Sequence, residues 1–241
     1  MRRLAGLLLL CGLALQVVFA LRVAAIAFVD PASTSFQRSE AWRLWQGEAS
    51  WSWRQDWVDA DRIAKALPRA VIASEDAGFA DHGGIEWDAI ERAWARNQAQ
   101  QARAERRVAD RPGQVARPPK LVGGSTITQQ LAKNLLLSGE RNVLRKAQEA
   151  AITLWLELWL DKPRILEVYL NHVEWGAGVF GAQAAAQRYF RVDAARLNDR
   201  QAARLAVMLP APKRFEKRPD SAYLAGRTEV ILGRMGDVQW P

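Results

Sequence analysis

The stretch LVGGSTITQQLAKNLLL, residues 121–137, is the one around which the rest of the chain is organised. Its paired glycines adopt backbone angles that other residues avoid, so they let backbone N–H groups approach a ligand closely. Ser125 or Thr126 can then cap the helix that follows. Exposed N–H groups at a helix start, with Lys133 further along, are the parts of an anion site. Because the GK[ST] ending of a nucleotide P-loop is absent, the stretch indicates a phosphate or pyrophosphate site, or only a capped helix, and not an ATP site.

Polar side chains on this helix are candidate substrate ligands. Residues four apart share one helical face, which pairs Gln129 with Lys133 and Gln130 with Asn134. Arg141 and Lys146 add positive charge near the end of the same helix. The candidate substrate-binding residues are therefore Ser125, Thr126, Gln129, Gln130, Lys133, Asn134 and Arg141.

The N-terminal segment predicts a membrane anchor at residues 1–29. Residues 4–21 are apolar apart from Gln16, and 18 helical residues at about 1.5 Å each span roughly 27 Å, near the thickness of a bilayer core. A cleaved signal peptide is the rival interpretation, but its apolar region usually has about 7–15 residues and ends in an A-x-A site, which is not clear here. Arg2 and Arg3 favour a cytoplasmic N-terminus, which places the rest of the chain outside.

The charge of the chain fits a membrane setting. Its 34 Lys and Arg residues against 26 Asp and Glu residues give a formal net charge of +8. Outside the membrane this charge would face anionic lipid head groups or an anionic lipid-linked substrate, so nucleic acid is not the expected partner. The only cysteine, Cys11, lies in the anchor. Folding of the external part must therefore rest on core packing without an intrachain disulfide.

The remaining pattern predicts a mainly α-helical domain at residues 58–241, with two lobes and a cleft. Residues 30–57 form a juxtamembrane segment, in which a small polar linker at 31–39 precedes five tryptophans. These favour an interfacial belt or, for Trp51, Trp53 and Trp57, core packing. A helical extension and a mobile loop are expected over 97–120, an insertion rich in Gln, Ala and Arg. The predicted helices span 61–74, with a kink or a break at Pro68, and 85–96, 142–160, 162–171, 182–190, 199–208 and 221–235. Residues 173–180 are expected to form a turn, and no strand pattern is convincing.

Two acids are the candidates for catalysis. Glu75 ends the first predicted helix, and apolar neighbours there would desolvate it and raise its pKa, as a general acid or base requires. Glu149 lies among alanines in mid-helix, and its alternative role is an ordinary ion pair with Arg145 four residues earlier. His82 is expected to tie a loop by a hydrogen bond, and its alternative role is a third polar group at the site. Two carboxylates beside cations suit glycosyl transfer with a phosphate-bearing leaving group.

Four motifs, in order, carry a family resemblance. They are EDAGFADHGG at 75–84, GGSTITQQLAKN at 123–134, RKAQE at 145–149 and KPRILEVYLN at 162–171. Over residues 58 to 212 and the anchor, the chain resembles the monofunctional biosynthetic peptidoglycan transglycosylases. These belong to glycosyltransferase family 51, which also forms the N-terminal domain of bifunctional penicillin-binding proteins. The chain departs from the family at Glu86, where Asp or Ser is usual, and in the length of 97–120.

The resemblance implies a lysozyme-like fold that polymerises lipid II. The growing glycan, linked through pyrophosphate to undecaprenyl, would be the donor in a single inverting displacement. Glu75 matches the general base that deprotonates the acceptor hydroxyl, and Lys133 and Arg141 match cations that stabilise the departing pyrophosphate. Glu149 matches a second essential acid that either positions a substrate or holds a divalent metal, Mg²⁺ or Mn²⁺.

The resemblance also implies a setting, and two other functions compete with it. It implies a single-pass protein of the bacterial inner membrane with a periplasmic catalytic domain, and proteins of cell division or elongation as candidate partners. A lytic transglycosylase or lysozyme cleaves glycan with one acid and needs neither an anion site nor an anchor beside a lipid substrate. An inactive membrane-tethered scaffold would not need both Glu75 and Glu149.

Overall fold

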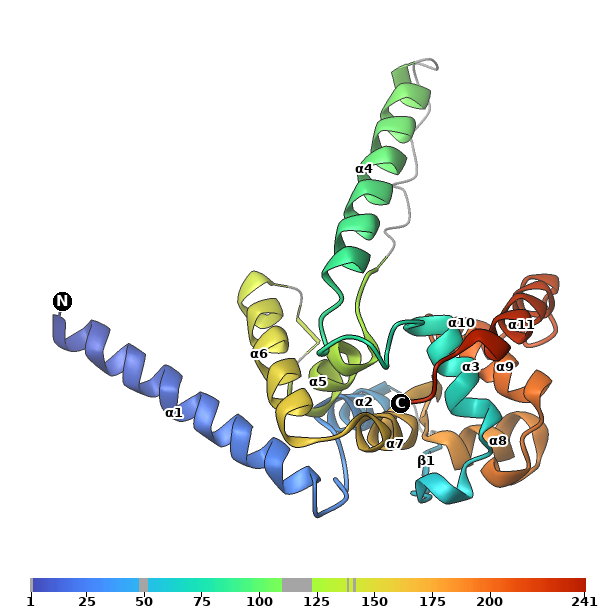
Figure 1. The fold of residues 1–241 in the computed structure, drawn as a ribbon, viewed down its shortest axis with the longest axis horizontal. Coiled ribbons are helices and arrows are strands. Elements are labelled where there is room, and N and C mark those ends of the chain that lie inside the picture. Colours follow the sequence, from blue (N-terminus) through green and yellow to red (C-terminus); the bar gives the residue numbers. More distant parts are fainter. Residues whose placement is uncertain (1, 48–51, 110–122, 138, 141) are drawn as a thin grey trace.

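A computed structural model describes residues 2–47, 52–109, 123–137, 139–140 and 142–241 (Figure 1). The described helices confirm the mainly α-helical class and the apolar N-terminal helix. In chain order the elements are α1 (Arg2–Ile26), α2 (Ser35–Gly47), β1 (Arg54–Gln55), η1 (Ala60–Arg62), α3 (Ala66–Glu75), α4 (Trp87–Ala109), α5 (Ile127–Leu136), α6 (Val143–Trp159), α7 (Lys162–His172), β2 (Glu174–Gly176), β3 (Val179–Phe180), α8 (Ala182–Phe190), η2 (Ala194–Arg196), α9 (Asp199–Met208), α10 (Pro212–Phe215), α11 (Ala222–Arg234) and η3 (Met235–Asp237).

Two groups of helices make up the body. Helices α3, α9 and α11 pack on one another, while α5 packs against α2, α6 and α7. Their facing sides are apolar, and the largest fully buried side chains include Trp175, Tyr169, Phe79 and Phe180. The end of α3 reaches the start of α5, so the two groups meet where the first two sequence motifs lie.

A small sheet corrects the expectation that the domain lacks strands and that residues 173–180 form only a turn. Strands β2 and β3 are antiparallel neighbours, and β1 pairs in parallel with β3. Gly178 has a φ of +70°, and a Cβ there would lie 2.0 Å from the carbonyl oxygen of Ser52, so the hairpin needs glycine at this point. Strands of two or three residues contain too few alternating positions for a period to be recognised.

The N-terminal part of the domain also differs from its prediction. Residues 35–39, predicted as linker, begin α2, because Thr34 and Gln37 cap it: the Gln37 amide donates to Thr34 Oγ1 at 3.0 Å and the Thr34 amide to Gln37 Oε1 at 2.8 Å. The helix predicted at 61–74 is a 3₁₀ turn followed by α3. Pro68 lies in the first turn of α3, where its missing N–H is not needed, and no kink results.

The tryptophans of the juxtamembrane segment lie in two kinds of environment, the protein interior and the exposed surface. Trp53 packs on Phe180 with ring centroids 4.6 Å apart, and Trp57 lies 5.7 Å from the His172 ring, so these two contribute to packing. Trp42 and Trp45 are exposed on α2. Trp51 lies outside the described residues.

Helix α1 is long and apolar enough to cross a membrane, and most of its length is exposed. Its C-terminal half is fixed to the body. Gln16 Nε2 donates to Gln148 Oε1 on α6 at 2.9 Å, and the Arg164 guanidinium donates to the Ile26 carbonyl oxygen at 2.9 and 3.1 Å. The anchor therefore leaves the body from the side that carries α6 (Figure 1).

Helix α4 projects from the body as a 23-residue arm (Figure 1). It contains most of the helix predicted at 85–96 and the first part of its predicted extension, as one continuous helix. The remainder of the predicted insertion, residues 110–120, lies outside the described residues.

Candidate active site

The start of α5 is held by a capping box. Thr126 Oγ1 accepts from the Gln129 amide at 3.1 Å, and Gln129 Oε1 accepts from the Thr126 amide at 3.1 Å. The Thr126 hydroxyl also donates to the Gly84 carbonyl oxygen at 2.6 Å, and both residues are buried. Of the two candidates Ser125 and Thr126, Thr126 is the cap. The side-chain oxygens of Thr126 and Gln129 thus hold the helix start, and substrate binding by either residue stays a prediction.

Three backbone N–H groups at this helix start are bonded within the protein, so these three are not open to a ligand. Asp76 Oδ2 accepts from the Ile127 amide at 2.9 Å, while the Thr126 and Gln129 amides are bonded within the cap. A carboxylate at a helix N-terminus meets the positive end of the helix dipole. Asp76 therefore occupies the position that the sequence suggested for a phosphate.

A pocket of about 340 Å³ opens farther along α5 and against α6. Its charged side chains are Lys133, Glu140, Arg145, Lys146 and Glu149, so three cations face two acids. The predicted residues that it brings together are Ser125, Gln129, Gln130, Lys133, Asn134 and Glu149. Arg141 lies outside the described residues. A phosphate-bearing group entering this pocket would meet side-chain cations.

The pocket also contains residues that sequence analysis did not select as ligands. Phe36 reaches it from α2, and Arg145 and Lys146 reach it from α6. The RKAQE motif contained the second and third of these, but helical spacing alone made Arg145 an ion-pair partner. Phe36 precedes the RKAQE motif by 109 residues, and no local pattern could have placed it there.

Glu149 is a buried acid matched by two cations. Its side chain is 4% exposed, with Arg145 Nη1 2.7 Å from Oε2 and Lys146 Nζ against Oε1. The predicted Arg145 pair is present, and Lys146 adds a second partner. Removing either cation would leave the buried charge of Glu149 poorly compensated. The two ion pairs thus hold both cations on the pocket wall.

A divalent metal does not fit Glu149 in this arrangement. Each carboxylate oxygen is already bound by a cation, and Mg²⁺ or Mn²⁺ would have to displace Arg145 or Lys146 to coordinate it. The positive charge near the pocket comes from lysine and arginine side chains of the protein.

Glu75 lies at the C-terminal end of α3, partly buried. Burial is the main cause that raises the pKa of its carboxyl group, and the charge of Asp76 raises it further, while hydrogen bonds from Gln130 and Ser74 lower it. A carboxylate with a raised pKa is a better proton acceptor than a solvated one. The predicted environment of Glu75 is therefore present.

A short relay orients the group that faces Glu75. Gln130 Nε2 donates to Glu75 Oε2 at 3.2 Å, and the Tyr169 hydroxyl donates to Gln130 Oε1 at 2.9 Å. Because the hydroxyl fixes which end of the amide is oxygen, the NH₂ end must point at Glu75. Tyr169 is 1% exposed, and burial raises the pKa of its phenol well above the ordinary value, so it stays a donor. Its place in the KPRILEVYLN motif was the only sequence signal for it.

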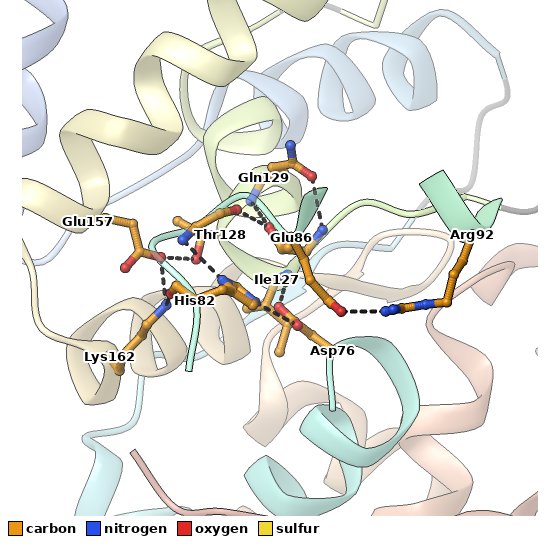
Figure 2. A network of polar contacts seen from close by, with 11 residues as sticks. Asp76, His82, Glu86, Arg92, Ile127, Thr128, Gln129, Glu157 and Lys162 are labelled. Atoms are coloured by element: carbon orange, nitrogen blue, oxygen red, sulfur yellow. Dashed lines mark hydrogen bonds and ion pairs between the residues drawn. The ribbon is translucent and has the colours of Figure 1, made fainter. Parts of the chain in front are cut away.

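A second network joins the first motif to α5 (Figure 2). His82 Nε2 lies 2.8 Å from Asp76 Oδ1, and His82 Nδ1 accepts from the Gly84 amide at 3.0 Å. This confirms that His82 ties a loop. Lys162 Nζ supports the same loop, since it donates to the His82 carbonyl oxygen at 2.7 Å and pairs with Glu157 at 2.9 Å.

The carboxylates of Asp76 and Glu86 and the His82 ring place one potential ligand atom each within 4.8 Å of one another, but their bonding does not suit a metal. Because His82 Nδ1 accepts a hydrogen bond from the Gly84 amide, Nε2 carries the ring hydrogen and donates a hydrogen bond to Asp76 Oδ1, so neither ring nitrogen has a free lone pair. Glu86 is paired with Arg92 at 2.7 Å. The cluster links loop to helix.

Comparison with known proteins identifies the family of this chain. Residues 46–236 match the profile of a family described as Transglycosylase. The chain belongs to the transglycosylase family. The match includes both acids, α5 and α6, so the whole pocket apart from Phe36 lies in the transglycosylase region.

Relatives of this transglycosylase share about half of its residues. The biosynthetic peptidoglycan transglycosylase of Burkholderia pseudomallei is 51% identical over 229 residues, covering 95% of this chain and 83% of the relative. The protein of the same name from Cupriavidus metallidurans is 50% identical over 244 residues, covering 99% and 97%. That from Cupriavidus pinatubonensis is 52% identical over 234 residues, covering 95% and 86%.

Proposed function

We propose that this transglycosylase builds peptidoglycan by polymerising lipid II, with inversion at the sugar carbon and release of undecaprenyl pyrophosphate. The name shared by its relatives supports the substrate class. The observation that carries the proposal is the pocket in which Lys133, Arg145 and Lys146 gather beside Glu149. A polymerising enzyme must stabilise a pyrophosphate leaving group, whereas an enzyme that cleaves glycan has no such anion to meet.

Glu75 is the proposed general base. The 4-hydroxyl of the incoming sugar gives its proton to the Glu75 carboxylate as its oxygen attacks the anomeric carbon of the donor. The bond from that carbon to the pyrophosphate oxygen breaks, and the pyrophosphate leaves with the electron pair. The α-linked donor becomes a β-linked product in one step, so no covalent enzyme intermediate is needed. The raised pKa of Glu75 suits the proton transfer.

The leaving group is proposed to lie against the cations of the pocket. Lys133 of α5 and Lys146 of α6 lie on different helices and line the same cavity. Arg145 is held there by Glu149. Arg141 is proposed as a further cation by its place in the sequence. In this scheme Glu149 does not transfer a proton; it keeps Arg145 and Lys146 where charge develops on the pyrophosphate.

The proposal includes the location of the protein in a membrane. Helix α1 is proposed to cross the bacterial inner membrane once, with the N-terminus in the cytoplasm and the catalytic domain in the periplasm, beside lipid-linked substrates. Residues 1–29 would be the anchor, 30–57 the juxtamembrane segment and 58–241 the glycosyltransferase domain. Proteins of cell division or elongation are candidate partners.

The test is to incubate the full-length purified protein in detergent with labelled lipid II, and separately with preformed glycan. The parent should yield polymer, and Glu75→Gln should lose about 10²–10⁴-fold in rate because an amide cannot accept the proton. Cleavage of the glycan without polymer formation would make the protein a lytic enzyme instead. Failure of both reactions in a folded parent would favour the scaffold hypothesis.

A further inference from the structure

A second pocket, of about 670 Å³, lies where α10 leads into α11 and shares no lining residue with the candidate active site. We call it the basic groove. Its lining residues are Lys213, Arg214, Phe215, Lys217, Arg218, Ser221 and Tyr223. Four of these seven side chains are cationic and none is acidic, so the groove differs in charge from the first pocket.

The positive charge of the groove is not balanced by nearby acids. Of the four cations only Lys213 has carboxylate partners, Glu40 at 2.5 Å and Glu174 at 3.2 Å, among the residues that the structure describes. Arg214, Lys217 and Arg218 are exposed. The acids of the same segment are engaged elsewhere, because Glu216 accepts from the Ala177 amide and Asp220 pairs with Arg204. A ligand with two or more negative charges would supply the missing partners.

Aromatic rings form part of the same groove. The Phe215 and Tyr223 rings are parallel within 5°, with centroids 5.8 Å apart, and the Arg214 guanidinium lies 5.9 Å from the Phe215 centroid. Tyr223 is 60% exposed, although large aromatic side chains usually find cover. Exposed rings beside cations suit a ligand that offers both apolar C–H surface and negative charge.

The position of the groove indicates which ligand it meets. Lys213 is bound to Glu40 of α2, and Phe36, four residues earlier on α2, lines the active-site pocket. Four residues of helix correspond to about 6 Å along the axis. Helix α11 lies at the opposite end of the long axis of the molecule from the free end of α1 (Figure 1). A ligand in the groove would therefore be near the active site and away from the membrane that α1 is proposed to cross.

We propose that the basic groove binds the carboxylates of the peptide branches on the glycan strand that leaves the active site. This inference rests on the proposed function, since that reaction makes a strand with sugar rings and peptide carboxylates. Anionic phospholipid head groups offer negative charge too, but they lie on the side of α1. Retention of the product strand beside the pocket would favour repeated addition to the same strand.

The test replaces the three exposed cations by glutamine, in the variant Arg214→Gln/Lys217→Gln/Arg218→Gln. The matched control, Arg188→Gln/Arg196→Gln/Arg234→Gln, removes three exposed cations elsewhere and leaves the same net charge. The probe is a soluble disaccharide-peptide fragment of peptidoglycan, titrated by calorimetry against the full-length protein. The same disaccharide without peptide, and vesicles with about one third phosphatidylglycerol, are titrated in parallel. Melting curves verify that each variant is folded.

The parent and the control should bind the disaccharide-peptide fragment equally. The groove variant should bind it at least about tenfold more weakly, since it loses the charge-assisted hydrogen bonds of three cations to the peptide carboxylates. Added salt should weaken binding by the parent. Undiminished fragment binding by the groove variant, or a loss confined to the vesicles, would overturn the proposal.

Polymerisation separates this inference from the proposed function. The groove variant should couple the first sugars at the parent rate but release shorter strands. Unchanged strand length in an active variant would refute the groove and leave the proposed function intact. A parent that makes no polymer would refute the proposed function, while the fragment titration would still decide whether the groove binds peptide carboxylates.

Discussion

Replacing Tyr169 by phenylalanine tests whether the relay from Tyr169 through Gln130 orients the base. The change removes one oxygen from a fully buried side chain and preserves its ring. Gln130 Oε1 then loses its donor, and the amide is free to turn its oxygen toward Glu75. An oxygen facing the carboxylate would repel it, whereas the amide NH₂ stabilises it.

The magnitude follows from the bond that is lost. A hydrogen bond to a charged group contributes about 1.5–3 kcal/mol, and the distance of 3.2 Å between Gln130 Nε2 and Glu75 Oε2 favours the lower end. A loss of about 1.4 kcal/mol lowers the rate about tenfold at pH values below the acidic limb, where less of Glu75 is in the base form. Because the Gln130 bond lowers the pKa of Glu75, its loss should raise that pKa. The acidic limb of kcat/KM should then move to higher pH, since the base form appears only above it.

The assay is lipid II polymerisation across pH for the parent and for Tyr169→Phe, with Tyr189→Phe as the matched control. The Tyr189 hydroxyl donates to the Trp175 carbonyl oxygen at 2.7 Å and does not contact Glu75. Both variants lose one hydrogen bond and should lose similar stability, but only Tyr169→Phe should move the limb. Asp76 and Tyr169 are the other titratable groups that act on or face Glu75, and Asp76 is unchanged in both variants.

Two results would refute the relay. One is a slower Tyr169→Phe enzyme whose acidic limb stays in place, which would indicate general loosening of the site. The other is an equal shift in Tyr189→Phe. In a double-mutant cycle, Tyr169→Phe should add little to Gln130→Leu, because both changes break the same relay.

Three further predictions test the pocket, the anchor and the sheet. Lys133→Ala should lower the polymerisation rate about 10²–10³-fold with little change in melting temperature, and an unchanged rate would remove Lys133 from the anion site. A chain starting at Pro31 should polymerise lipid II in detergent but act poorly on lipid II in liposomes; equal activity of both chains on liposomes would contradict the role of α1. Burial raises the pKa of Glu174 to about 7 from an ordinary 4.5, so near pH 6 the folded state holds a proton that the unfolded state releases. The free energy of unfolding should therefore fall as the pH rises from about 5 to 7. Glu174→Gln should therefore raise the melting temperature at pH 8 more than at pH 5, with up to about 3 kcal/mol involved, and an equal gain at both values would argue against the titration of Glu174.

The sequence was sufficient to predict the features that depend on neighbouring residues. Helical spacing predicted the Arg145–Glu149 pair, and the apolar setting predicted the raised pKa of Glu75. Cap residues could be recognised because their effect is local. These features placed both acids on helices and one acid beside cations.

Features that depend on distant contacts could not be predicted. Phe36 enters the pocket because α2 packs on α5, and Tyr169 reaches Gln130 because α7 packs there too. The three short strands form because Gly178 admits the Ser52 carbonyl oxygen, a contact across more than a hundred residues. Neither hydrophobic period nor turn propensity contains such information.

The start of α5 differs in part from the expected anion site. A glycine-rich entry to a helix suggested that backbone N–H groups would bind the phosphate, yet Asp76 already accepts from the Ile127 amide. The dipole of α5 is thus used inside the protein, to fix the residue next to the proposed base, and the charge of Asp76 in turn raises the pKa of Glu75. In the proposed reaction the pyrophosphate would be met by side-chain cations, and Lys133, Arg145 and Lys146 line the pocket in which it would lie. In the proposed reaction the two halves are separated, because the helix start would orient the base while the cations would receive the leaving group.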